Sequence, residues 1–129
     1  MTDRFPKGLE LRKQVLGEAH VERSMANTNK FMMPMQEFTT ESCWGTAWSR
    51  PGLPMKTRSM LCIALLTALN RQHELGMHVA AALDNGCTVS EVQEVLMHAA
   101  TYCGVPAGLD AFRTAEKALK ERGVDLNDL

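Results

Sequence analysis

Two side chains with acid–base chemistry stand four residues apart near the middle of the chain, Glu74 and His78. On a helix this spacing places both on one face. There a carboxylate can orient an imidazole and stabilise its charge, and apolar surroundings tune a histidine near neutral pH. The pair is therefore a candidate proton donor with its positioning group. An ion pair on a helix surface, or an ordinary core histidine, would show the same spacing.

The spacing of the histidines argues against a metal site on this segment. A zinc-binding helix needs two histidines four residues apart, whereas His73 and His78 are five apart. They would lie about 140° apart around a helix and could not share one ion. The sequence also lacks the G-x-S-x-G, G-x-x-x-x-G-K-[ST] and G-x-G-x-x-G motifs of hydrolases and nucleotide-binding proteins. We expect no metal and no cofactor.

Aromatic and cationic side chains form a second group of candidates, for substrate binding. Trp44 and Trp48 stand four residues apart, Arg50 follows in a turn, and Arg58 lies near a helix start. An apolar wall with guanidinium groups can hold a carboxylate. Tyr102 lies at the junction of two expected helices. A tryptophan pair anchoring a helix end, solvated arginines and a tyrosine capping the core are the alternatives.

Helix signals recur along the chain and define the elements that must position these residues. Thr88 and Glu91 form a capping box, and Asn85-Gly86 before it suits a helix end. Residues 17–29 lack apolar periodicity, so we expect a loop or a mobile arm there, which could also wrap a neighbouring subunit. The sequence predicts helices over residues 7–16, 34–47, 54–70, 72–85, 88–103 and 106–122.

Composition agrees with this outline. The chain has 129 residues, of which 45% are hydrophobic and 22% charged, values typical of a single globular domain. Aromatic residues make up only 5%, and no segment alternates apolar and polar residues as a strand would. The sequence therefore predicts one all-α domain over residues 1–129, a compact bundle of about six helices.

Charge and hydropathy exclude other classes of partner. The 14 basic and 15 acidic residues give a net charge of -1, so no cationic field attracts nucleic acid. The apolar run 61–69 is far shorter than the roughly 20 residues that span a bilayer, and no secretion signal is recognisable. We expect a cytoplasmic protein. Its cysteines fit neither a redox pair nor a zinc site, and we expect reduced, mostly buried thiols: Cys43, Cys62, Cys87 and Cys103.

Five short segments in a fixed order carry a family resemblance. They are Trp44-Gly45 through Arg50-Pro51-Gly52-Leu53, Thr57-Arg58-Ser59-Met60, Glu74-Leu75 with His78, Asn85-Gly86 with Thr88, and Tyr102-Cys103-Gly104-Val105-Pro106. Together they resemble the carboxymuconolactone decarboxylase family over about residues 16–119. The resemblance implies an alkylhydroperoxidase-like helical fold and a homo-oligomer, a trimer or hexamer. It also implies conversion of 4-carboxymuconolactone to 3-oxoadipate enol-lactone, with loss of carbon dioxide, in the β-ketoadipate pathway of aromatic catabolism.

A sister branch of the same superfamily, alkylhydroperoxidase, carries a C-x-x-C-x-x-x-H motif. Placed with its histidine on His78, this motif would require cysteines at Arg71 and Glu74. The dithiol route of that branch is therefore absent. A thiol-dependent hydroperoxide reductase using a lone Cys103 or Cys62 remains an alternative. A non-catalytic oligomeric binder of small organic acids is the other.

The chemistry of the implied reaction assigns roles to the candidates. Loss of carbon dioxide leaves a dienolate, so the protein must stabilise an oxyanion and then protonate carbon. We assign His78 as the proton donor and Glu74 as the group that holds its tautomer and raises its basicity. Arg50 and Arg58 would bind the substrate carboxylates, only one of them at the departing end. The aromatic side chains would wall the pocket and exclude water: Trp44, Trp48 and Tyr102.

Overall fold

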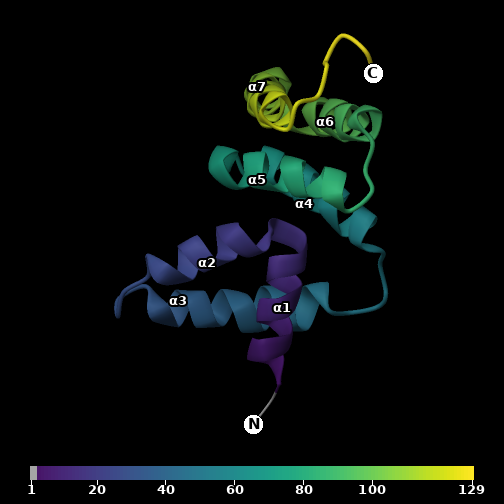
Figure 1. Cartoon of the computed structure of the whole chain (residues 1–129). Coiled ribbons are helices and arrows are strands. Elements are labelled where there is room, and N and C mark those ends of the chain that lie inside the picture. Colours follow the sequence, from purple (N-terminus) through teal and green to yellow (C-terminus); the bar gives the residue numbers. More distant parts are fainter. Residues whose placement is uncertain (1–2) are drawn as a thin grey trace. The chain divides into compact units, whose positions relative to one another are not determined.

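The computed structural model describes residues 3–129, and this part of the chain is helical without a strand. The all-α prediction is therefore confirmed. Contacts divide the chain into two compact units, one ending at Pro54 and the other spanning Met55–Leu129. The elements are α1 (Arg4–Leu16), α2 (Glu18–Ala26), α3 (Met33–Phe38), a π-helix η1 (Thr39–Trp48), α4 (Met55–Ala68), α5 (Gln72–Asp84), α6 (Val89–Cys103) and α7 (Val105–Glu121) (Figure 1).

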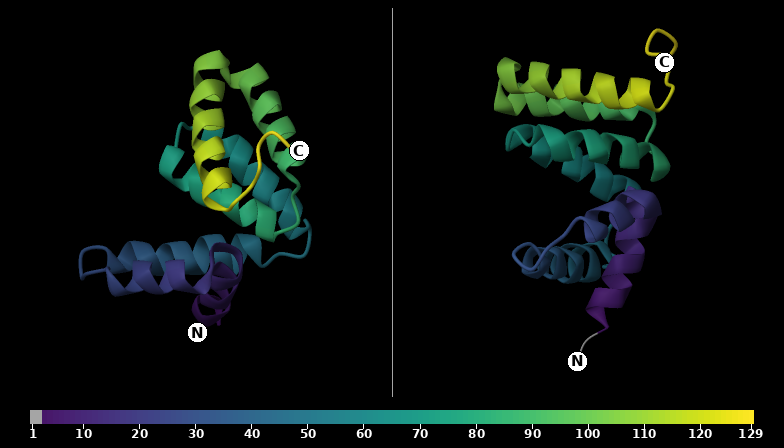
Figure 2. Two further views of the ribbon diagram at one scale, coloured as in Figure 1. Left: turned by 45° about the horizontal axis from the view of Figure 1, so that its top comes forward. Right: turned by 60° about the vertical axis from the view of Figure 1, so that its left-hand side comes forward.

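The first unit is built around the crossing of α1 and η1 (Figure 2). The two backbones approach so closely that only glycine fits on either side. A Cβ atom on Gly8 would overlap the carbonyl oxygen of Thr40 and lie 2.7 Å from the nitrogen of Gly45. A Cβ on Gly45 would overlap the carbonyl oxygen of Arg4. The contact thus requires the missing side chains of both glycines.

The expectation of a loop over residues 17–29 is wrong, because most of this segment forms α2. Gly17 separates α1 from α2 with a φ of 94°, a conformation that favours glycine. Along α2 only Val21 is buried, so the helix shows no apolar stripe from which its periodicity could be recognised. Polar contacts with the other helices of the unit hold it instead.

These polar contacts centre on Arg12, whose side chain is buried at 7% exposure. Its Nη1 donates to Oε1 of Gln36 at 2.9 Å and to Oγ1 of Thr40 at 3.3 Å, and its Nη2 donates to Oγ of Ser24 at 3.3 Å. Gln36 in turn donates to Ser24 Oγ at 3.0 Å. One guanidinium group therefore ties α1, α2, α3 and η1 together. Its burial lowers the pKa of Arg12.

The second unit consists of two layers, the pair α4–α5 and the pair α6–α7 (Figure 2). Its core is aliphatic and closely packed. Gly108 of α7 lies against α6, where a Cβ atom would be 2.5 Å from Cβ of Ala100. The buried core residues are Ile63, Leu75, Val79, Ala82, Cys87, Val92, Leu96, Ala111, Ala115, Ala118 and Leu119.

The helix boundaries of this unit confirm the sequence signals. The capping box is complete, because Glu91 N–H donates to Thr88 Oγ1 at 3.0 Å and Thr88 N–H donates to Glu91 Oε1 at 2.9 Å. Gly86 and Gly104 adopt φ angles of 97° and 100° at the turns that precede α6 and α7. These two junctions bound α6 at its start and its end.

Candidate active site

Glu74 and His78 lie on α5, as predicted. The helix buries Leu75, Val79 and Ala82 in the core, so the ring of His78 stands at the edge of that apolar face and is half-buried. Glu74, one turn earlier, is exposed. The imidazole therefore meets a dry environment on one side, with the charge of a solvated carboxylate near it.

Two opposing effects set the acidity of this imidazole. Burial is the larger and lowers the pKa of His78 below its ordinary value of 6.5, while the charge of Glu74 raises it. The prediction that Glu74 raises the basicity of the ring is right in direction, but desolvation outweighs it. The ring is consequently mostly uncharged at pH 7 in the substrate-free protein.

This shift predicts a pH-dependent contribution to stability. Below pH 6.5 the unfolded chain binds a proton at position 78 that the folded chain resists, so the free energy of unfolding falls as the pH is lowered through 6.5 toward the folded-state pKa. We expect His78→Gln to lose this part of the pH dependence. Urea unfolding of both proteins between about pH 5 and 7.5 measures it.

The matched control is His73→Gln, which removes an exposed imidazole from the same helix. We expect this variant to keep the wild-type dependence. A His78→Gln protein whose unfolding free energy follows the same curve as the wild type would contradict the assignment of a desolvated ring at position 78.

The tryptophan pair lies on η1, the π-helix. Trp44 and Trp48 are buried, and their ring centroids are 4.9 Å apart with planes tilted by 31°. π-helices are rare and occur frequently at functional sites. Ser49 donates through Oγ to the carbonyl of Gly45 at 2.7 Å and closes the end of η1. Arg50 follows this turn and is exposed.

The remaining two predicted residues belong to the second unit. Arg58 is half-buried in the first turns of α4, beside the fully buried Ser59. Tyr102 is 78% exposed, and its ring lies against His98, with centroids 5.1 Å apart. The four-residue step from His98 to Tyr102 on α6 is the sequence signal for this contact. Tyr102 therefore lies at the surface of this unit, and its ring packs against His98 and not against His78.

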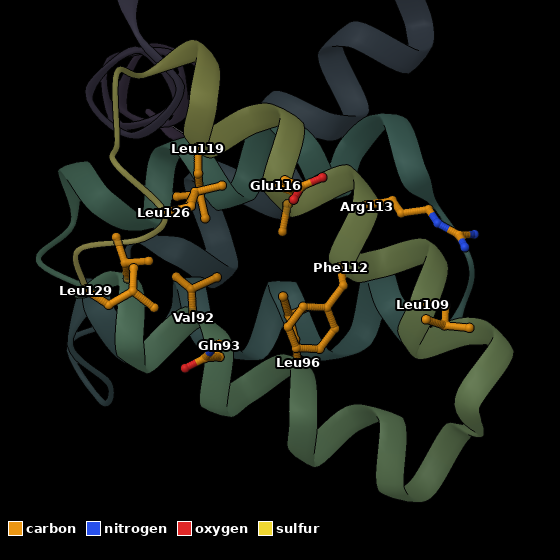
Figure 3. Close-up of a pocket in the computed structure, with 12 residues that line it drawn as sticks. Val92, Gln93, Leu96, Leu109, Phe112, Arg113, Glu116, Leu119, Leu126 and Leu129 are labelled. Carbon is orange, nitrogen blue, oxygen red and sulfur yellow. The ribbon is translucent and has the colours of Figure 1, made fainter.

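A cavity of about 270 Å³ opens between α6 and α7 (Figure 3). Leu126 and Leu129 of the carboxyl-terminal segment lie at one end, and Arg113 stands at the other. Its lining is mainly aliphatic, with Phe112 in the middle. None of the predicted site residues lines it, so this cavity does not locate the reaction.

The cysteines are all free thiols. Cys87 is buried and Cys43 and Cys62 are half-buried, but Cys103 is exposed at the end of α6, so the expectation of mostly buried thiols is only partly right. Within residues 3–129, no group of three or more His, Cys, Asp or Glu side chains is arranged to hold a metal ion. No described helix has the length and apolar character to cross a membrane.

An all-helical chain with a desolvated histidine and a nearby carboxylate on one helix fits a small enzyme that uses acid–base chemistry. The sequence profile of the carboxymuconolactone decarboxylase family matches residues 34–117. The chain belongs to this family.

Two relatives extend the comparison. A protein of Acinetobacter baylyi named 4-carboxymuconolactone decarboxylase is 46% identical over 121 residues, which cover 94% of this chain and 90% of the relative. A protein of Metarhizium robertsii named nitrosuccinic acid decarboxylase is 41% identical over 117 residues, 91% of this chain and 82% of the relative. The prediction of a decarboxylase is confirmed.

Proposed function

We propose that this protein removes carbon dioxide from 4-carboxymuconolactone, or from an acid with the same activation, by general acid catalysis at His78. The observation that carries the proposal is the half-buried imidazole of His78, whose pKa is raised by the charge of Glu74 and lowered by burial. The chain is also 46% identical to a protein named 4-carboxymuconolactone decarboxylase. The reaction needs no redox step. It needs a stabilised carbanion and a proton.

The named substrates of the two relatives share this chemistry. In the lactone, the electron pair left by carbon dioxide passes through the ring double bond to a carbonyl oxygen. In nitrosuccinic acid, one carboxylate is attached to the carbon that bears the nitro group, so the pair is delocalised onto the nitro oxygens. Both acids also keep a second carboxylate that does not leave. We infer a substrate class with one activated and one spectator carboxylate.

The state of His78 suggests how the proton is supplied. The ring is mostly uncharged in the substrate-free protein, but an anion bound beside it favours its protonated form. The substrate therefore recruits the proton that is later delivered to carbon. Glu74 holds the ring in the required tautomer and partly offsets its desolvation.

Substrate carboxylates call for guanidinium groups. Arg58 is our candidate for the spectator carboxylate, because a half-buried guanidinium binds a carboxylate more strongly than a solvated one does. Roles in substrate binding for Arg50, Trp44, Trp48 and Tyr102 are part of the proposal and rest on the sequence. For the two tryptophans, their burial on a π-helix adds support.

The proposal extends to setting and assembly. We place the reaction in the β-ketoadipate pathway of aromatic catabolism and the protein in the cytoplasm, where free thiols such as those found here stay reduced. We also propose a homo-oligomer, because large apolar side chains are exposed in both units. The largest exposures are those of Phe31, Tyr102, Val105, Leu69 and Phe38.

A direct assay tests the proposed activity. Purified protein is incubated with 4-carboxymuconolactone, and lactone absorbance and released carbon dioxide are followed together. A parallel reaction contains nitrosuccinate, and a third contains a hydroperoxide with a dithiol donor. We expect equal loss of lactone and gain of carbon dioxide, with the hydroperoxide unchanged.

Each of the other outcomes is informative. Turnover of nitrosuccinate alone would keep the substrate class and replace the substrate. Hydroperoxide reduction that disappears in Cys103→Ser, with both acids untouched, would overturn the proposal in favour of a thiol-dependent reductase. Binding of the acids without release of carbon dioxide would leave a binding protein.

A further inference from the structure

One face of the second unit carries a ridge of exposed leucines. Leu61 and Leu65 on α4 and Leu69 directly after its end follow each other at four-residue steps and are 46%, 59% and 63% exposed. Residues at this spacing form one ridge along a helix. The opposite side of α4 is already packed, with Ile63 fully buried in the core. The leucine ridge is thus an apolar helix face that the unit itself does not cover.

A groove runs beside the ridge, between α4 and α6. Its volume is about 560 Å³, and its apolar lining residues are Met60, Leu61, Ala64 and Val95. Leu61 belongs to both the ridge and the groove. The remaining lining residues are Thr57, Ser90, Glu91, Glu94 and His98.

We propose that two copies of the chain pair through this face, with their α4 helices antiparallel and the two-fold axis passing between ridge and groove at the level of Leu65. A surface that carries a ridge beside a groove is complementary to itself, since a two-fold rotation sets the ridge of each copy into the groove of the other. The inference deepens the homo-oligomer of the proposed function by naming the face that joins one pair of copies.

The charges at the two ends of the face agree with an antiparallel pairing. Lys56 and Glu91 form an ion pair at 2.8 Å, which sets the start of α4 level with the start of α6. The acidic side chains Glu91 and Glu94 therefore line the end of the groove near Thr57. At the other end of the ridge, beyond Leu69, stands the exposed Arg71.

Reversing one copy brings these ends together. With the axis at the level of Leu65, Arg71 of one copy reaches the level of the groove end where Glu94 of the other is exposed. A parallel pairing would instead place Glu94 against Glu94 and Arg71 against Arg71. Electrostatic complementarity of this kind fixes register more than it adds affinity.

The size of the face suits a pair of moderate stability. Three half-exposed leucines offer on the order of 300 Å² of apolar surface per copy. A standard interface buries about 800 Å² per partner, so the ridge supplies more than a third of it. The groove walls and the charged ends surround the ridge and supply further area.

Substitution of Leu65 tests the pairing. Leu65 is 59% exposed, so Leu65→Glu leaves the core of the unit intact while placing a charge from each copy in the apolar interface. We expect the molar mass, measured by sedimentation velocity over a range of concentrations, to fall by a factor of two or more. Leu109→Glu is the matched control, since it changes a leucine on α7 that is 49% exposed. It should keep the wild-type mass.

A charge exchange then tests the antiparallel register. Arg71→Glu and Glu94→Arg should each weaken the pair at least tenfold in Kd, and the double variant should recover most of the loss. A change of assembly in Leu65→Glu without recovery in the double variant would overturn the antiparallel pairing. An unchanged mass in Leu65→Glu would overturn the face. A wild type that stays monomeric would overturn the face and the proposed oligomer together, whereas the decarboxylation assay reports on the activity separately.

Discussion

His78→Ala is expected to lower kcat for decarboxylation by about 100- to 10,000-fold, the range typical of losing a general acid. The Michaelis constant should change little, because the ring acts on the carbanion rather than on the carboxylates. The imidazole stands at the edge of a buried apolar face, which desolvates it. Water has poor access to that position and is a weak substitute. Steady-state kinetics with the lactone measures both constants.

The control for this prediction is His73→Ala, which removes an exposed imidazole from the same helix and should leave kcat unchanged. Helical circular dichroism of both variants checks that each is folded. A folded His78→Ala protein that decarboxylates at the wild-type rate would remove His78 from the mechanism. A rise in KM with unchanged kcat would make it a substrate-binding residue instead.

Gly8→Ala is expected to destabilise the first unit by about 3 kcal/mol, at the upper end of the range for overpacking. The added methyl group would overlap the Thr40 carbonyl oxygen and lie 2.7 Å from the nitrogen of Gly45. Both obstacles are backbone, so neither can rotate away, and α1 must move off η1. The tryptophans of the chain, Trp44 and Trp48, both lie on η1. Tryptophan fluorescence during urea unfolding therefore reports on this unit.

Gly52→Ala provides the comparison. A Cβ atom at Gly52 would have nothing within 4 Å, so the midpoint of the fluorescence transition should stay within experimental error of the wild type. A Gly8→Ala protein with an unchanged midpoint would show that the crossing of α1 and η1 is looser than described.

Much of the fold could be predicted because the signals that start and end its helices are local in the sequence. The hydrogen bonds of a capping box join residues three apart, so Thr88 and Glu91 predict the start of α6 without information from the rest of the chain. The stripe of Val92, Leu96 and Ala99 likewise follows from helical periodicity, and all three are buried. Signals of this kind gave the class of fold and most helix boundaries.

The missed features depend on contacts between distant segments. Helix α2 is held by Arg12 and Gln36, which lie outside it, and a polar anchor leaves no periodic pattern. The π-helical form of η1 has no recognisable sequence signal. The pKa of His78 shows the same limit, because its partner Glu74 is visible in the sequence whereas the burial that outweighs this partner is a property of the packed core.

The sequence identifies candidate site residues more readily than it predicts which of them contact one another. Glu74 and His78 are neighbours because they lie one helical turn apart. In the structure the negative charge of Glu74 raises the pKa of His78, as predicted. Tyr102 meets His98 instead, with ring centroids 5.1 Å apart, because both lie on the same face of α6. A four-residue step identifies a neighbour on one helix but says nothing about neighbours on another.

The pH dependence of kcat/KM tests the role of His78 most directly, since this ratio reports the ionisation of the free enzyme. The pKa of His78 lies below 6.5 in the free protein, and the donor must carry its proton. We therefore predict that kcat/KM is highest in acid and falls as the pH rises through a value below 6.5, and that His78→Gln loses this decline. A ratio that is constant, or that rises over the same range in the wild type, would contradict proton donation by His78.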